Sequence, residues 1–377
     1  MQARHLLHVF STFAVGGQQT RFCTIANALE RRYRHSIVAM DGDYSCAERL
    51  SPAVDWEIVP VAVARNRFVS LGNIRRFGDI LGERRPDLLL TYNWGTIEWG
   101  LVARGQRQVG HIHFEDGFGP GESPDVQMWR RATFRRLALG GSTRVIVPSR
   151  TLERVATEQW KLRREQVLFL ANGVDCVRFA GRPDPAVVAP LCIPAGALTV
   201  GTVATLRAEK NLERLIEAVA FLPPHLNAHL VIVGDGAERA SLEKYAAHSP
   251  IAGQVRFTGA IREPERIYGA FDVFAMSSDT EQMPYSLLEA MAAGLPVAAT
   301  DVGDIADILP AENSRLVAGR RDAAGLARTL AFLGEDAARR AQLGGQNRAH
   351  VRATYDLQVM LRRYDAIFSG TDAARAG

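Results

Sequence analysis

Hydrophobic and amphipathic segments alternate along the first half of the chain. Buried strands are predicted by six short apolar runs, at residues 5–10, 35–40, 88–93, 109–114, 144–148 and 167–170. Between the first two runs, residues 18–31 place Phe22, Ile25 and Leu29 on one face of a helix. Strands that alternate with helices indicate βαβ units and a parallel sheet covered on both faces, so we expect a doubly wound α/β domain.

The second half repeats this alternation after a break. Residues 181–196 are rich in Gly, Pro and Ala, which is typical of a linker. Six further strands are predicted, at residues 198–204, 229–234, 255–259, 273–277, 296–300 and 315–317. The pattern is helical from about residue 323 to the end. The predicted organisation is a Rossmann-like domain at residues 1–180, a second one at 197–353, and a C-terminal helical segment at 354–377.

Composition agrees with a globular protein of two domains. The chain has 377 residues, of which 47% are hydrophobic and 23% charged. No segment approaches the roughly 18 apolar residues that cross a bilayer, and the first residues lack the pattern of a signal peptide, so we expect a cytoplasmic protein. The four cysteines, Cys23, Cys46, Cys176 and Cys192, form no CxxC pair, so we expect reduced structural thiols and no metal site.

The net charge of +4 is mild, but four arginines cluster in one short segment. Arg130, Arg131, Arg135 and Arg136 are interleaved with Trp129, Phe134 and Leu137. One interpretation is a solvated helix face. The other is docking on an anionic membrane surface, which would place the protein peripherally on the inner face of the cytoplasmic membrane. No nucleic-acid-binding module accompanies the arginines, so no nucleic-acid partner is expected.

The most informative motif lies at residues 278–297. A predicted strand ends near residue 277, a polar loop with Glu281 follows, Pro284 marks the first residue of a helix, and Gly294 marks its end. Because a helix start offers backbone N–H groups and a positive dipole end, it is suited to bind a diphosphate. Glu281 in the loop and Glu289 inside the helix could then reach different parts of one ligand.

Two cations follow the first predicted strand of the second domain. Arg207 and Lys210 lie in the loop before a helix that is expected to begin near Asn211. Such a pair suits an anionic leaving group, whereas the alternative is a solvated surface pair.

Three further glycine-containing turns follow predicted strands. Gly16 and Gly17 lie where a strand passes into a helix, so the backbone there could approach a phosphate or sugar closely. Asn172 with its following glycine, and Gly234 before Asp235, also lie at strand ends. Each of these could instead be only a tight turn.

These motifs together resemble glycosyltransferase family four over essentially the whole chain. Glu281 and Glu289 match the family's Glu-x7-Glu pattern, Gly16 and Gly17 its N-terminal glycine loop, and residues 172–175 its Asn-Gly-Val-Asp segment. The resemblance implies a GT-B fold, which is two Rossmann-like domains facing across a cleft, with the last helix crossing back to the first domain. It also implies a retaining, metal-independent transfer from a UDP- or GDP-sugar to a glycan or lipid-linked acceptor.

The resemblance also assigns roles to residues. Arg207 and Lys210 would hold the diphosphate, and Glu289 would bind the ribose. Glu281 would contact the donor sugar together with the loop that follows it. The donor-binding set comprises Gly16, Gly17, Asn172, Gly234, Met283, Pro284, Tyr285, Ser286, Leu287 and Glu289.

Two departures from the family pattern concern the sugar. Gln282-Met283 stands where relatives carry Gly-Phe, and Asp116, in the segment 113–117, stands where they carry His. We expect Asp116 to contact donor-sugar or acceptor hydroxyls and count it with Arg207, Lys210 and Glu281 as a catalytic candidate. The alternative is that Asp116 caps the turn at Gly117.

No cofactor is expected, because the nucleotide sugar is a substrate. Asp41-Gly42-Asp43 has the form of a metal-binding DxD motif, but it follows a strand of the first domain and more simply indicates a turn. The functional alternative is a non-catalytic protein on the same fold that binds a sugar nucleotide or a lipid surface. A dehydrogenase is disfavoured because the chain lacks a GxGxxG fingerprint.

Overall fold

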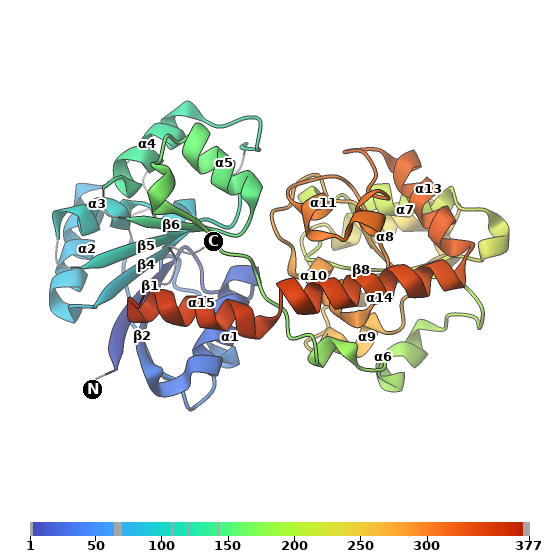
Figure 1. Cartoon of the computed structure of the whole chain (residues 1–377), viewed down its shortest axis with the longest axis horizontal. Helices are drawn as coiled ribbons and strands as arrows, with labels where there is room; N and C mark the ends of the chain where they lie inside the picture. Colours follow the sequence, from blue (N-terminus) through green and yellow to red (C-terminus); the bar gives the residue numbers. More distant parts are fainter. Residues whose placement is uncertain (1–2, 64–69, 107–108, 120, 142, 372–377) are drawn as a thin grey trace. The chain divides into compact units, whose positions relative to one another are not determined.

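The computed structural model describes residues 3–63, 70–106, 109–119, 121–141 and 143–371. The chain forms two compact units. Unit 1 comprises Met1–Ala171 together with Leu361–Gly377, and unit 2 comprises Asn172–Met360. Figure 1 shows a parallel sheet with surrounding helices in each unit.

Unit 1 contains a seven-stranded parallel sheet with the order β3-β2-β1-β4-β5-β6-β7. Its strands are β1 (Arg4–Phe10), β2 (Tyr33–Ala39), β3 (Asp55–Ile58), β4 (Leu88–Tyr92), β5 (Gly110–Phe114), β6 (Arg144–Val147) and β7 (Val167–Phe169). The helices are α1 (Gly17–Leu29), α2 (Leu71–Arg84), α3 (Glu98–Gly105), α4 (Trp129–Leu139) and α5 (Arg150–Glu158). The edge strand β3 was not predicted from the sequence.

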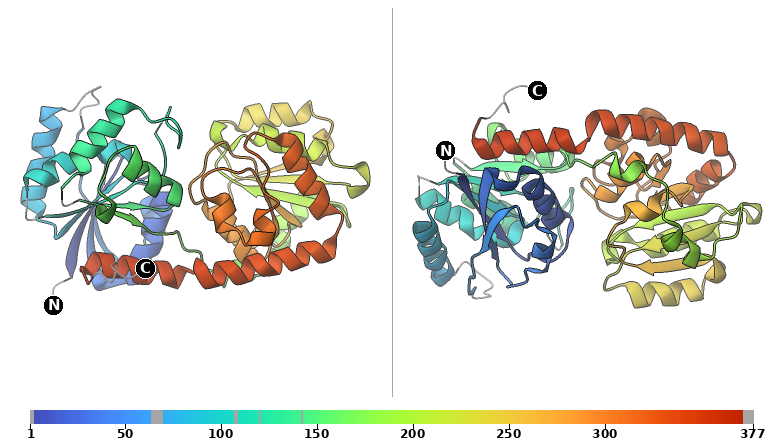
Figure 2. Two further views of the ribbon diagram at one scale, coloured as in Figure 1. Left: turned by 45° about the horizontal axis from the view of Figure 1, so that its top comes forward. Right: turned by 90° about the horizontal axis from the view of Figure 1, so that it is seen from below.

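Alternate residues of β1 face two different helical layers. Leu7 and Val9 pack with Phe77 of α2 and Trp99 of α3. His8 and Phe10 face the opposite layer, where His8 contacts Phe22 of α1 and Phe368 of α15 (Leu357–Ser369). This period-two pattern explains why β1 is buried on both faces, and Figure 2 shows helices on both sides of the sheet.

Unit 2 contains a five-stranded parallel sheet with the order β10-β9-β8-β11-β12. The strands are β8 (Thr199–Val203), β9 (His229–Val233), β10 (Val255–Gly259), β11 (Val273–Met276) and β12 (Val297–Ala299). The helices are α6 (Pro185–Val188), α7 (Leu212–Ala220), α8 (Arg239–Ala247), α9 (Glu265–Tyr268), α10 (Tyr285–Ala293), α11 (Ile305–Ile308), α12 (Ala311–Ser314), α13 (Ala323–Gly334) and α14 (Ala337–Thr354).

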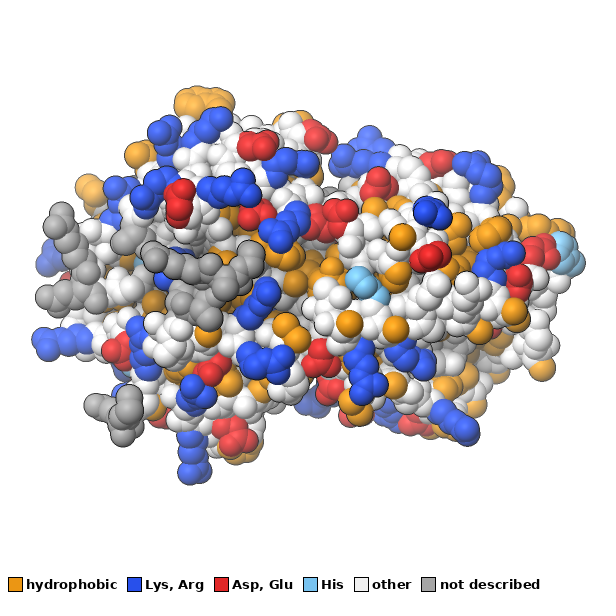
Figure 3. All heavy atoms as spheres, in the orientation of Figure 1, with side chains coloured by type: hydrophobic (Ala, Val, Ile, Leu, Met, Phe, Trp, Pro, Cys, Tyr) orange, Lys and Arg blue, Asp and Glu red, His pale blue; other side chains and the backbone are white. Residues whose placement is uncertain are grey.

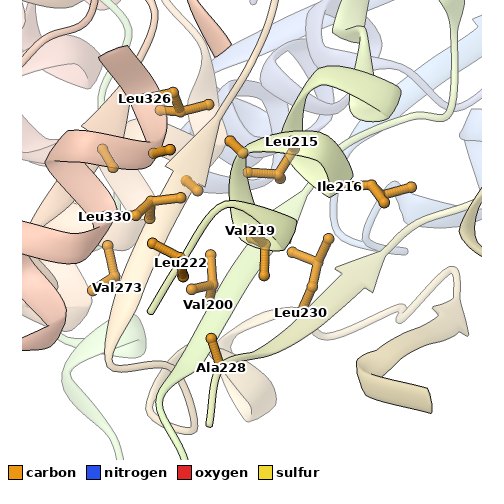
Figure 4. Packing of buried hydrophobic residues seen from close by; sticks show 14 of the residues in the cluster. Val200, Leu215, Ile216, Val219, Leu222, Ala228, Leu230, Val273, Leu326 and Leu330 are labelled. Carbon is orange, nitrogen blue, oxygen red and sulfur yellow. The ribbon is translucent and has the colours of Figure 1, made fainter. Parts of the chain in front are cut away.

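A large hydrophobic cluster fixes α7 and α13 against this sheet (Figure 4). Leu215 and Val219 of α7 meet Leu330 of α13 and Val200 of β8, all of them buried. The apolar residues of α7 recur at spacings of three and four, which predicts one buried face. This packing fixes the orientation of α7 and of the loop that precedes it.

One predicted strand is wrong. Residues 315 and 316 follow the end of α12 as a turn, residue 317 has no regular structure, and Ala318 forms an isolated bridge with Thr300. Leu316 and Val317 look like a strand because they are apolar. Leu316 instead packs against the hydrophobic cluster of unit 2 from outside the sheet. The other predicted strands match β1, β2 and β4–β12, with ends shifted by a few residues.

Candidate active site

Helix α10 begins beside the carboxyl end of β11, as the motif predicts. Pro284 is the N-cap residue with φ −71° and ψ 130°, and the helix starts at Tyr285, one residue later than expected. Proline has no polar side-chain atom to cap the first turn, and that turn contains no acidic residue. Gly294 ends the helix in the left-handed conformation, with φ 79°. The N-terminus of α10 therefore keeps the character of an anion-binding site.

Lys210, just before α7, and Glu281, in the loop before α10, form an ion pair. The Lys210 Nζ lies 2.5 Å from the Glu281 Oε1, and the Ser278 hydroxyl donates to the same oxygen at 2.7 Å. The side chains of Lys210 and Glu281 are 21% and 9% exposed. Glu281 is thus held in one position by two donors from different loops, and Lys210 retains a partly open face.

Arg207 is the more open of the two predicted cations. Its side chain is 63% exposed, and its guanidinium lies 4.0 Å from the Glu209 carboxylate. An exposed pair at this distance contributes little to stability. The charge of Arg207 is therefore available to a ligand.

A second charged group at this edge was not predicted. Arg214, on α7, donates to Asp279 at 2.7 Å and to the Ser277 carbonyl at 2.6 Å, while the Asn211 amide donates to Asp279 at 3.0 Å. Burial alone would raise the pKa of Asp279, but Asn211 and Arg214 outweigh it and lower that pKa. The group fixes the loop after β11 to the start of α7. Asp279 lies three residues after the end of β11, and this position was the available sequence signal.

Glu289 lies one turn inside α10 with its carboxylate against an aromatic neighbour. The Tyr268 hydroxyl donates to the Glu289 Oε2 at 2.7 Å. Burial raises the pKa of Glu289 to about 7, although this hydrogen bond and the Arg178 guanidinium act in the opposite direction. Tyr268 lies on α9, 21 residues before Glu289, and no sequence pattern pointed to it.

The predicted Asn172 reaches the loop that contains Met283. Its side-chain amide donates to the Met283 carbonyl at 2.9 Å, and the Tyr285 hydroxyl donates to the Asn172 Oδ1 at 3.3 Å. Met283 is 5% exposed, whereas Pro284, Tyr285 and Ser286 are partly exposed. Leu287 is fully buried, so its side chain belongs to the core.

Gly234 lies against the segment that leads to Arg207. It has φ 140°, and a Cβ built there would overlap the Ala204 carbonyl oxygen, at 1.8 Å. Only glycine allows this approach of the two backbones. Gly234 is therefore placed to support the loop after β8.

Gly16 and Gly17 lie at the start of α1 in unit 1. Gly16 is the N-cap residue, in extended conformation with φ −159°, and Gly17 is the first helical residue. Neither position requires the left-handed region. The structure thus places both glycines at a helix start but gives them no conformation that other residues could not adopt.

Asp116 follows β5 and is paired with α1. Arg21 donates to both carboxylate oxygens of Asp116, at 2.5 and 2.8 Å, and the Gln18 amide donates to Oδ2 at 2.7 Å. The backbone N–H of Asp116 donates to the Asn93 side chain at 2.8 Å. Asp116 is 17% exposed and Arg21 4%. The carboxylate does not cap the turn at Gly117 in the described contacts but completes a buried ion pair.

The Asp41-Gly42-Asp43 segment forms a turn. Asp41 accepts from the Asp43 backbone N–H at 3.0 Å, and Asp43 accepts from the Ser45 N–H at 2.9 Å. The latter hydrogen bond lowers the pKa of Asp43. Across the described residues, no three His, Cys, Asp or Glu side chains are grouped as metal ligands.

The four cysteines are free thiols. Cys23 and Cys46 are buried, and their Sγ atoms lie 3.8 Å apart. This is well beyond the roughly 2.05 Å of a disulfide bond.

The arginine segment is the helix α4, but its arginines have different surroundings. Arg135 is fully buried and donates to Glu122 at 3.0 and 3.1 Å and to Glu115 at 3.3 Å. It also lies over the rings of Trp94 and Trp160. The expectation that Arg135 faces solvent or lipid is wrong, because Glu115 and Glu122 compensate its charge inside unit 1. These two glutamates lie 20 and 13 residues away in the sequence.

Only part of α4 is therefore open. Arg131 is half-buried and pairs with Glu122 at 3.3 Å. The remaining exposed face, which we call the α4 strip, comprises Trp129, Arg130, Thr133, Arg136 and Leu137. Figure 3 shows basic and apolar side chains together on the surface where Figure 1 places α4. Among the residues that the structure describes, no helix meets the length and hydropathy needed to span a membrane.

Known protein families match the chain over both of its units. Residues 16–173 match the family described as a glycosyl transferase 4-like domain, and residues 189–350 match glycosyl transferases group 1. EpsF of Bacillus subtilis, which is named as a putative glycosyltransferase, is 30% identical over 318 residues, 79% of each chain. A GDP-mannose-dependent phosphatidylinositol monomannoside mannosyltransferase of Mycobacterium tuberculosis is 30% identical, over 65% of this chain and 66% of its own.

Solved structures show the same fold. HepE of Anabaena, in complex with UDP and glucose, has a TM-score of 0.79 and 20% identity, over 97% of this chain and 99% of its own. The lipopolysaccharide-biosynthesis glycosyltransferase WaaG has a TM-score of 0.75 and 20% identity, over 97% and 100%. Two parallel-sheet α/β units of this kind define the GT-B fold. The chain belongs to glycosyltransferase family four and is a glycosyltransferase.

Proposed function

We propose that the enzyme transfers a sugar, with retention and without a metal, from a UDP- or GDP-sugar to a glycan or lipid-linked acceptor in polysaccharide biosynthesis. The observation that carries this proposal is the set of groups at one edge of unit 2. The start of α10, the open Arg207 and the partly open Lys210 supply positive charge, and Glu281 lies beside them. HepE, with a similar fold, was solved with UDP and glucose, which supports a nucleotide sugar as donor.

The chemistry of transfer explains why these charges matter. Breaking the anomeric carbon–oxygen bond places positive charge on the sugar and negative charge on the departing diphosphate. Preorganised cations and backbone N–H groups stabilise that developing negative charge more than they stabilise the ground state. In this proposal Arg207 and Lys210 bind the diphosphate, Glu289 binds the ribose, and Glu281 orients the donor sugar.

A thermal-shift panel of nucleotides and nucleotide sugars tests the donor assignment. A ligand that binds only the native state raises the melting temperature, because it stabilises that state by about 2.7 kcal/mol at a hundred times its Kd. We expect UDP or GDP, and one of their sugars, to raise it. If no nucleoside diphosphate or nucleotide sugar shifts the melting temperature at millimolar concentration, the proposed function is wrong.

Metal independence is tested separately. Turnover is expected to be unchanged by EDTA, because side-chain cations and backbone groups stabilise the leaving diphosphate. Activity that is abolished by EDTA and restored by Mg²⁺ or Mn²⁺ would reject this part of the proposal. Asp41 and Asp43 would then be the candidate metal ligands.

The location of the enzyme is proposed from the α4 strip. We propose a cytoplasmic protein that binds peripherally to an anionic membrane. Trp129 is 71% exposed and Leu137 55%, and Arg130 and Arg136 lie on the same face. Aromatic and apolar groups that enter the interface, flanked by cations, are the features of an interfacial helix. A lipid-linked acceptor would be accessible from such a position.

Vesicle co-sedimentation tests the membrane proposal. Replacing Arg130 and Arg136 with Gln is expected to weaken binding to phosphatidylserine-containing vesicles at low salt, by up to about 1 kcal/mol for each charge. The matched control replaces Arg31 and Arg32, which are also exposed but lie in unit 1 away from α4. Equal losses in both double variants, or no loss in either, would assign the α4 strip to the solvated surface.

A further inference from the structure

The loop between β11 and α10 is held by Asn172. Two hydrogen bonds join Asn172 to the loop: its backbone N–H donates to the Met283 Sδ at 3.1 Å, and its side-chain amide donates to the Met283 carbonyl at 2.9 Å. A third comes from the first residue of α10, where the Tyr285 hydroxyl donates to the Asn172 Oδ1 at 3.3 Å. These partners fix which end of the amide faces which group. Asn172 is 4% exposed and Met283 5%, so these contacts are shielded from water.

The same loop is held from its other side by the segment after β12. Gly303 has φ 61°, and a Cβ built there would lie 2.2 Å from the Glu281 carbonyl oxygen. The next residue, Asp304, donates its backbone N–H to the Gln282 carbonyl at 3.4 Å. Glu281, Gln282 and Met283 therefore lie between two supports, and one of these supports is Asn172.

The sulfur of Met283 takes part in one of these contacts. A thioether is a weak hydrogen-bond acceptor on a flexible chain, whereas a phenylalanine ring edge or a leucine offers no acceptor atom to an N–H. Met283 therefore stands in for the aromatic residue of the family pattern while its side chain is turned inward, towards Asn172. The side chain that would otherwise be available to a ligand is used to fix its own loop.

We propose that Asn172 and Met283 form a clasp that positions the Glu281 loop and thereby determines which donor sugar is accepted. This inference rests on the proposed function, because it assigns the loop to the sugar of the nucleotide sugar. Asn172 is then a positioning residue that acts through Met283 and Tyr285. In the proposed function the diphosphate is bound by Arg207, Lys210 and the backbone N–H groups of α10, and neither clasp variant replaces any of these groups. Disturbing the clasp is therefore expected to change the contribution of the sugar to binding more than that of the nucleoside diphosphate.

Two variants disturb the clasp from opposite sides. Met283→Leu keeps the volume and the carbonyl acceptor but removes the sulfur. Asn172→Asp keeps the shape but turns a carboxylate oxygen towards the Met283 carbonyl. Their matched controls are Met291→Leu, at a fully buried methionine on α10, and Asn313→Asp, at a fully buried asparagine that bonds to β12.

Calorimetric binding of UDP, GDP, UDP-glucose, UDP-galactose, UDP-N-acetylglucosamine and GDP-mannose measures the effect. For the sugar that wild type prefers, both clasp variants are expected to lower the ratio of Kd for the nucleoside diphosphate to Kd for the nucleotide sugar by about tenfold. Kd for the nucleoside diphosphate itself is expected to change less than twofold, and both controls are expected to keep the wild-type ratio.

Methyl NMR gives a readout that a purely structural role would not move. In protein labelled with ¹³C-methyl methionine, the Met283 signal is the one missing in Met283→Leu. It is expected to shift when the preferred nucleotide sugar is added but not when the nucleoside diphosphate is added, and Asn172→Asp is expected to abolish that difference.

The outcomes separate the inference from the proposed function. A wild-type protein that binds none of these six probes overturns both. Wild-type binding with an unchanged ratio in both clasp variants overturns the clasp alone. Controls that change the ratio as much as the clasp variants also overturn the clasp alone, because a general loss of stability would then explain the effect.

Discussion

The two sheets use charge in different ways at their carboxyl edges. In unit 1, Arg21 is paired with Asp116 and buried, and Arg135 is paired with two glutamates and buried. In unit 2, Arg207 is 63% exposed, and Lys210 pairs with Glu281 while keeping one open face. Charges that are compensated inside the protein define its structure, whereas open cations are available to a ligand. Substitutions at these positions test the distinction, and the most damaging is expected at Arg135.

Arg135 is expected to be the most sensitive of these charges. Replacing it with Met leaves Glu115 and Glu122 buried with less compensation, and breaking a buried pair in this way costs about 3–5 kcal/mol. Burial alone would raise the pKa of Glu122, but Arg135 and Arg131 together outweigh it and lower that pKa. Urea unfolding measures the loss. The neighbouring exposed Arg136→Met should change stability by less than about 0.5 kcal/mol, and equal effects at both positions would contradict the comparison.

Arg207 and Lys210 should behave in the opposite way. Replacing either with Ala is expected to lower turnover roughly a hundredfold, which is about 3 kcal/mol of barrier, because each is a preorganised charge at the departing diphosphate. The melting temperature should fall little for Arg207→Ala, since its side chain is largely exposed. Steady-state kinetics and thermal unfolding of the same samples decide this. Near-normal turnover in both variants would remove the assignment to the diphosphate.

Asp116 lies between these two cases, because it is paired but 17% exposed. Asp116→Asn is expected to cost about 1–3 kcal/mol of stability, since it leaves the buried Arg21 with a neutral partner. We also expect turnover to fall more than nucleotide affinity, as for a substrate contact.

Arg21→Gln is the matched variant for Asp116, because it breaks the same pair from the buried side. Lower turnover in Asp116→Asn but not in Arg21→Gln would assign Asp116 to the substrate. Equal turnover effects in both would assign it to the ion pair alone.

The stability of the two units is expected to depend on pH with opposite sign. Burial lowers the pKa of His35 to about 4, so the stability that neutral His35 gives to unit 1 is present above pH 6.5 and is lost as the pH falls towards 4. Burial raises the pKa of Glu289 to about 7, so its contribution to unit 2 is present below pH 4.5 and is lost as the pH rises to 7.

Hydrogen exchange mapped onto each unit measures this difference. Between pH 7 and pH 5, protection is expected to fall around β2 and to rise around α10. Glu289→Gln, which cannot ionise, should remove the dependence in unit 2 and leave that of unit 1. If protection changed with pH in the same direction in both units, His35 and Glu289 would not control the pH dependence.

The contrast between local and long-range contacts explains how much could be predicted from the sequence. The alternation of apolar runs predicted most strands and the α/β class, because burial on both faces leaves a local pattern. The edge strand β3 was missed because its four residues are half-buried or exposed and contain two acids. The Glu281 loop and α10 were predicted because all their signals lie within one short segment.

The pairs that fix these segments were not predicted. Met283 and Asn172 are 111 residues apart, and Asp116 and Arg21 are 95 apart, so only the folded chain brings them together. The same reason underlies the error at Arg135. A cluster of arginines in a sequence is typical of a solvated surface. Nothing within that segment indicates that Glu115 and Glu122 pair with Arg135 in the folded chain.

The Arg21–Asp116 pair also limits the routes by which this enzyme can diverge. A histidine at position 116, as in the family pattern, would leave the Arg21 guanidinium buried without its carboxylate partner. A neutral residue at position 21 would likewise leave the Asp116 carboxylate without its cationic partner. Either single change passes through a destabilised intermediate, so the two positions are expected to change together. Among natural homologues, a histidine after β5 should therefore accompany an uncharged residue in the second turn of α1.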